Sequence, residues 1–122
     1  YRRIKEYNSK LTFRKKDNKY SERVSKSFGK IIVNEFQRQN LRTHKVSSAV
    51  RGHLYRRGKK TLPAVLRYSK VPTSVLVEVA NLNNRHDRQD LLKSKTRQRM
   101  AVAIANSVFK KFEISKKMLA QR

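Results

Sequence analysis

The chain has 122 residues, a length that allows one domain or part of one, with a modest core. Lys and Arg total 32 against 8 Asp and Glu, giving a formal charge of +24 at pH 7. This surplus excludes an ordinary neutral globular protein and predicts attraction to polyanions, whether nucleic acid, teichoic acid or an anionic membrane. No apolar run approaches the roughly 18 residues of a membrane span, and the absence of cysteine excludes disulfides and thiolate metal sites.

The N-terminal third is predicted to contain one long helix. Residues 1–20 are polar and basic, with one short strand candidate, Leu11-Thr12-Phe13, followed by a charged run typical of a solvated loop. A helix is predicted from Ser21 to Gln39, because apolar residues recur at steps of three and four: Val24, Phe28, Ile31, Ile32 and Phe36. Gly29 inside this helix costs about 1 kcal/mol relative to Ala, which indicates close packing there.

The middle of the chain is predicted to form two strands. Residues 40–60 indicate a long, partly irregular loop. Leu62 to Tyr68 predicts a short strand opened by Pro63, which lacks a ladder donor. Ser74 to Ala80 is rich in β-branched residues and nearly all apolar, a pattern typical of a strand buried on both faces of a parallel or mixed sheet.

The C-terminal third is predicted to be helical. Asp87 and Asp90 resemble a capping arrangement for a short helix ending at Leu92. A longer helix follows, and its apolar face is expected to comprise Met100, Ala103, Ile104, Ser107 and Val108. Residues 113–122 are interpreted as a basic, fraying tail. Because strands and helices interleave along the chain, an α/β sheet flanked by helices is favoured over a helical bundle.

Glu78 is the candidate functional residue that the strand pattern singles out. A carboxylate at the end of a buried strand has a desolvation cost unless something stabilises it. Ligands of open α/β sheets bind beyond the carboxyl ends of the strands, where Glu78 would project. The alternative, at about even odds, is an edge-strand Glu that faces solvent or pairs with one of the many cations.

Other candidate sites give weaker signals. His44, His53 and His86 are not at metal-ligand spacings, and no set of two His and one Glu is visible for zinc. Three tyrosines lie among the basic residues, namely Tyr20, Tyr55 and Tyr68. Their rings can in principle stack on nucleic-acid bases, but a Tyr in a strand more often packs against its neighbours.

Two segments carry a family resemblance: KVPTSVLVEVANLNNRHDRQDLL and RQRMAVAIANSVFKKF. Together with Val65-Leu66-Arg67 before them, they resemble the C-terminal part of the zinc-dependent N-acetylmuramoyl-L-alanine amidases of the amidase-3 type. The shared order is an extended segment, a Pro at position 72, a strand ending at Glu78, an Asn-containing loop and a terminal helix ending near an aromatic residue. The helix SERVSKSFGKIIVNEF is also similar to one that precedes this region in the family.

The resemblance implies a twisted, mostly parallel sheet between helices and cleavage of the amide between N-acetylmuramic acid and L-alanine. It also implies a Zn²⁺ ion held by two His and one Glu, with Glu78 at the position of a further Glu that takes a proton from zinc-bound water. Arg67 and Asn81 are expected to line the substrate groove. The expected partners are peptidoglycan and anionic wall polymers, without specific nucleic-acid binding, in the cell envelope as a periplasmic or secreted enzyme.

The zinc ligands of the family precede the matched region, and nothing in residues 1–20 reproduces them; no His occurs before His44. The chain begins at Tyr1 without a signal segment, so we interpret it as a processed or truncated product. Residues 21–112 are expected to be the C-terminal part of a catalytic domain that is inactive in isolation. Two alternatives remain: a basic nucleic-acid-binding or ribosome-associated protein, and a non-catalytic peptidoglycan-binding protein.

Overall fold

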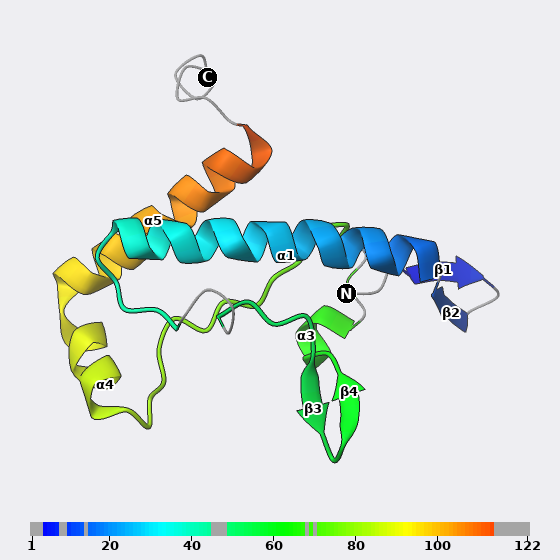
Figure 1. Ribbon diagram of the computed structural model, residues 1–122, viewed down its shortest axis with the longest axis horizontal. Coiled ribbons are helices and arrows are strands. Elements are labelled where there is room, and N and C mark those ends of the chain that lie inside the picture. The colour runs from blue at the N-terminus through cyan, green and yellow to red at the C-terminus, as the bar shows by residue number, and fades with distance from the viewer. Residues whose placement is uncertain are drawn as a thin grey trace. The chain divides into compact units, whose positions relative to one another are not determined.

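The computed structural model describes residues 4–7, 10–13, 15–44, 49–67, 69 and 71–113 (Figure 1). Its elements are β1 (Ile4–Tyr7), β2 (Lys10–Phe13), α1 (Lys15–Arg38), β3 (Leu54–Arg56), β4 (Lys59–Thr61), α3 (Ala64–Arg67), α4 (Arg85–Leu92) and α5 (Ser94–Phe112). The chain divides into two compact units. The first comprises residues 1–29 and 50–76, and the second comprises residues 30–49 and 77–122.

The long helix predicted from the apolar periodicity is confirmed as α1. Ile32 and Phe36 on its apolar face are buried. The helix begins at Lys15, so Lys15 to Lys19 of the run predicted to be a loop are helical instead. Extending a helix is easier than starting one, and packing has already formed this helix further along. Asn40 ends the helix in a left-handed conformation with φ of 53°, and the Leu41 amide donates back to the Phe36 carbonyl at 3.0 Å.

Gly29 lies where α1 contacts another segment of the first unit, which confirms the close packing predicted for a glycine inside this helix. A Cβ atom at this position would lie 2.9 Å from Cγ1 of Val50. Val50 has its branch point at Cβ, so its methyl groups cannot swing away as the end of a long side chain would. The absence of a side chain at Gly29 therefore permits this contact.

We expect Gly29→Ala to destabilise the protein by about 1 kcal/mol, because overpacking outweighs the gain of about 1 kcal/mol in helix propensity. In a Val50→Ala background the same substitution should be neutral or stabilising. Urea unfolding followed by circular dichroism measures both effects. Equal destabilisation in the two backgrounds would show that contact with Val50 is not the reason for the glycine.

The strands form two antiparallel hairpins instead of the expected mostly parallel sheet. Strand β1 pairs with β2, which contains the predicted strand Leu11-Thr12-Phe13, and β3 pairs with β4. The β3–β4 hairpin lies inside the segment predicted to be an irregular loop. Its turn residues, Arg57 and Gly58, both have positive φ angles, of 51° and 73°, as a two-residue type I′ turn requires. The described residues thus combine helices with two small sheets.

The strand predicted from Leu62 to Tyr68 is wrong, because Ala64–Arg67 form the short helix α3. The Leu66 amide donates to the Pro63 carbonyl at 3.0 Å, closing a helical turn. Proline has its φ angle fixed near the helical value and needs no partner for its nitrogen, so it suits the start of a helix as well as a strand edge. Tyr68 lies outside the described residues.

The strand predicted from Ser74 to Ala80 is also absent, since these residues have no regular secondary structure. Only the start of the segment is anchored, within the first unit. The Ser74 amide donates to Oγ of Ser25 at 3.0 Å, and the Ser69 and Ser74 hydroxyls are 2.7 Å apart. The side chains of Leu76, Val77 and Val79 are exposed. A β-branched run favours an extended backbone, but a strand forms only where a neighbouring strand supplies the ladder.

The second unit contains the apolar core of the described residues, namely Ile32, Phe36, Leu41 and Ala103. The predicted face of α5 is confirmed at its centre, where Ala103 and Ser107 are buried and joined by a hydrogen bond from Ser107 Oγ to the Ala103 carbonyl. Ile104 is 39% exposed and lies at the margin of this face. No described helix is both long and apolar enough to cross a membrane. The predicted tail beyond Glu113 lies outside the described residues.

Candidate functional site

Glu78 is exposed, as the solvent-facing alternative predicted, and does not lie at the end of a buried strand. A buried position required strands on both sides of residues 74–80, and without them the carboxylate remains in water. Its side chain forms no ion pair with any side chain that the structure describes. An exposed carboxylate can accept a proton from water, but positioning that water against a substrate requires further groups.

Asn81 follows three residues later and lies in a turn of the second unit. Its side-chain oxygen accepts a hydrogen bond from the Asn83 backbone amide at 3.0 Å, and the backbone amide of Asn81 donates to Oδ2 of Asp87 at 2.8 Å. The Asn81 side chain is therefore held in a defined orientation while remaining exposed. Arg67, the third candidate, lies in α3 of the first unit, and its side chain is outside the part of the chain that the structure describes.

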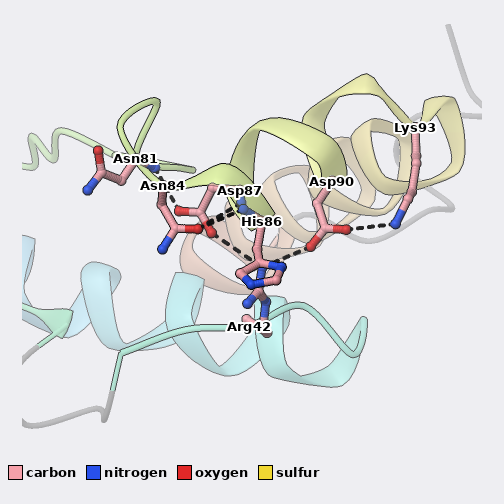
Figure 2. A network of polar contacts seen from close by, with 7 residues as sticks. All are labelled: Arg42, Asn81, Asn84, His86, Asp87, Asp90 and Lys93. Carbon is pink, nitrogen blue, oxygen red and sulfur yellow. Dashed lines mark hydrogen bonds and ion pairs between the residues drawn. The ribbon is translucent and has the colours of Figure 1, made fainter.

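The turn after Glu78 leads into α4 through a side-chain cap. Figure 2 shows Asn84 at the start of the helix, where its side-chain oxygen accepts from the amides of His86 at 2.9 Å and Asp87 at 3.2 Å. The predicted cap at Asp87 is therefore wrong by three residues: Asn84 is the N-cap and Asp87 lies in the first turn. Asn before a helix is a strong capping residue, because its oxygen satisfies amides that lack an intrahelical partner.

Ion pairs connect α4 to the segment that follows α1. Figure 2 shows the Arg42 guanidinium beside two carboxylates, with Nη2 lying 3.4 Å from Asp87 Oδ1 and 3.0 Å from Asp90 Oδ2. The ammonium of Lys93 lies 2.9 Å from the other Asp90 oxygen. The Arg42 and Lys93 side chains are more than half exposed, so these contacts orient α4 more than they stabilise it.

The ion pairs predict an acid-sensitive contact at Asp90. The hydrogen bond from Lys93 holds the pKa of Asp90 below its usual value of 3.8; desolvation opposes this shift, and Arg42 adds to it. A carboxyl group whose folded pKa is lowered contributes stability above its unfolded pKa, and that contribution is lost as the pH falls through the folded pKa. The stability difference between the wild type and Asp90→Asn should therefore be constant near neutral pH and shrink below about pH 4.

Nuclear magnetic resonance titration of the Asp90 carboxyl group measures this shift directly. Lys93→Gln should raise the pKa of Asp90 more than Arg42→Gln does, because the Lys93 hydrogen bond is the largest cause of the shift. An Asp90 pKa that is unchanged in Lys93→Gln would contradict this assignment.

The buried carboxylate of the second unit is Glu35, which the sequence patterns did not single out. Its side chain is only 4% exposed, and its Oε1 lies 2.5 Å from the Lys110 ammonium of α5 and 3.1 Å from Arg38. A signal for it was present, since Glu35 follows Ile31 and Ile32 by three or four residues on the apolar face of α1. Its two cationic partners make it a structural ion pair between α1 and α5.

The described residues do not fit a zinc ion. No group of three or more His, Asp or Glu side chains among them gathers as a metal site requires. His44 and His86 are exposed, and His53 packs edge-on against Tyr55 with ring centroids 5.1 Å apart. These residues therefore do not supply a metal site for catalysis.

Comparison with known proteins identifies the family. A model of the N-acetylmuramoyl-L-alanine amidases of the amidase-3 type matches residues 6–110, which include α1, most of each unit, Glu78 and nearly all of α5. No curated protein and no solved structure matches the chain significantly. Because the family model covers most of the sequence, the relationship does not depend on one short motif. The chain belongs to the amidase-3 family of N-acetylmuramoyl-L-alanine amidases, a family of peptidoglycan hydrolases.

Proposed function

We propose that this chain is part of the catalytic domain of a peptidoglycan amidase that hydrolyses the amide between N-acetylmuramic acid and L-alanine. The observation that supports the proposal is the family match across residues 6–110. Residues 21–112 belong to the catalytic domain, with residues 1–20 leading into it and residues 113–122 following as a basic tail. The enzyme works in the cell envelope, where its substrate is found.

Glu78 is the general base of this reaction. A carboxylate can take a proton from the water that attacks the amide carbonyl, and it can then return a proton to the leaving amine. Its exposure leaves the carboxylate accessible to substrate. Asn81 and Arg67 each contribute to substrate binding, and the hydrogen bond that the Asn81 side-chain oxygen accepts from the Asn83 backbone amide presets the orientation of that side chain.

A twisted, mostly parallel sheet is proposed for the complete catalytic domain. The zinc ion on which the family depends is held by ligands that are outside the described residues. The full-length protein is therefore expected to contain about one zinc ion per chain, whereas residues 1–122 alone are expected to retain none after dialysis.

Digestion of purified peptidoglycan by the full-length protein tests the proposed reaction. Mass spectrometry should detect free peptides beginning with L-alanine and intact glycan strands, with no increase in reducing sugar ends. An increase in reducing ends would indicate a glycosidase, and new amino groups within the peptides would indicate an endopeptidase. Either product pattern, or no product from a zinc-loaded protein, would contradict the proposal.

A further inference from the structure

The β3–β4 hairpin and the residues before it carry a concentrated positive charge. Residues 51–61 include no Asp or Glu and contain Arg51, Arg56, Arg57, Lys59 and Lys60. All of these cations are exposed. None forms an ion pair with a side chain that the structure describes, whereas the cations of the second unit at Arg42, Lys93 and Lys110 all have carboxylate partners.

The strand register places like charges opposite each other. Arg56 faces Lys59 across the hairpin, and Tyr55 faces Lys60. Directly opposed side chains in an antiparallel pair project from the same face, and like charges in that position destabilise the pair. The hairpin, shown in Figure 1, thus carries a repulsive pair at its tip that nothing among the described residues neutralises. An anion bound between Arg56 and Lys59 would relieve this repulsion.

We propose that the β3–β4 hairpin, residues 51–61, is a docking surface for a flexible phosphodiester polymer of the cell wall. Successive strand residues project from opposite faces, so the flexible polymer lies against Arg56 and Lys59 on one face and passes round the edge of the hairpin to Lys60 on the other. Arg57 at the turn extends the cationic track. This choice of polymer rests on the proposed function, because an enzyme that cleaves peptidoglycan meets the anionic polymers attached to it. Docking on them would hold the enzyme close to its substrate.

A nucleic acid is the competing polyanion, and the hairpin is less suited to it. Proteins that bind single strands without sequence preference combine a basic track with several aromatic rings on which successive bases stack. The hairpin exposes one aromatic side chain, Tyr55, at 67%, and His53 packs edge-on against its ring. A polyol phosphate has no bases and requires only the cations, which this hairpin supplies.

The test measures binding of fluorescently labelled poly(glycerol phosphate) to the full-length protein by anisotropy at several salt concentrations. The triple variant Arg56→Gln, Lys59→Gln, Lys60→Gln should bind about tenfold or more weakly, with a log–log salt slope smaller by about 2, since each lost phosphate contact removes roughly 0.7. The matched control Lys26→Gln, Lys30→Gln, Lys95→Gln removes the same charge from exposed positions on α1 and α5. It should lose no more than about threefold in affinity, because it removes no phosphate contact.

Equal losses in the two triple variants would overturn the proposal, because they would show attraction to the net charge rather than to the hairpin. Tighter, hairpin-dependent binding of a single-stranded oligonucleotide with the same number of phosphates would also overturn it, in favour of nucleic acid. The hairpin variant should unfold at the same or a higher temperature than the wild type, since it removes the repulsive pair. Binding is measured without peptidoglycan, so its result is separate from the presence or absence of amidase activity.

Discussion

Glu78→Gln in the full-length protein is expected to reduce peptide release from peptidoglycan by about 10²- to 10⁴-fold, the usual contribution of a general base. A carboxamide has nearly the shape of a carboxylate but cannot take a proton from the attacking water. Glu78 is exposed and has no described ion-pair partner, so its replacement should leave the free energy of unfolding within about 0.5 kcal/mol of the wild type. The measurement is the rate of release of L-alanine-terminated peptides.

Glu113→Gln is the matched control for this variant. Glu113 is also exposed, and it lies at the end of α5 beyond the region that the family model matches. Its substitution by Gln removes the same charge as Glu78→Gln. The activity of Glu113→Gln should equal that of the wild type. Zinc content should be the same in all three proteins, because Glu78 is proposed to act on water and not to hold the metal. Peptide release by Glu78→Gln at nearly the wild-type rate would exclude Glu78 as the base.

Lys110→Met is expected to destabilise the protein by about 2 kcal/mol. The substitution leaves the carboxylate of Glu35, 4% exposed, with only Arg38 as a partner. Breaking a fully buried ion pair costs about 3–5 kcal/mol. The Lys110 side chain is 44% exposed, so solvent already screens this pair and we expect a smaller loss. Urea unfolding followed by circular dichroism measures the difference.

The double variant Glu35→Leu, Lys110→Met should recover most of this loss, because apolar residues of similar volume often replace a buried ion pair without penalty. Arg38 is 65% exposed and can remain hydrated without its carboxylate partner. Lys111→Met, at the neighbouring position, is the control and should change stability by less than about 0.5 kcal/mol. If the double variant is as unstable as the single one, the unpaired carboxylate is not the source of the loss.

The central parts of the long helices α1 and α5 could be predicted because their signals are local. The spacing of Phe28, Ile32 and Phe36 gives the apolar face of α1, and Ala103 and Ser107 give that of α5. A glycine within a helix indicated the close contact that Gly29 makes with Val50. The residues that give these signals lie within a few helical turns of one another, because side-chain periodicity and helical hydrogen bonding depend on the nearby sequence.

The strands and the burial of carboxylates could not be predicted in the same way, because they depend on residues distant in sequence. The run from Ser74 to Ala80 has the composition of a buried strand, yet its ladder requires a neighbour that the run itself cannot specify. Whether Glu78 is buried or faces solvent depends on the same absent neighbours, and it is exposed, whereas Glu35 is buried and paired with Lys110 of α5.

The family, the long helices and the positive charge of this protein are already present in the amino-acid sequence, as a match over most of the chain, as helical periodicity and as composition. Strand pairing, the burial of Glu35 and the lack of carboxylate partners for the hairpin cations become visible only in the folded chain, among the described residues. Strand pairing and charge burial are properties of two surfaces brought together, so neither surface encodes them alone.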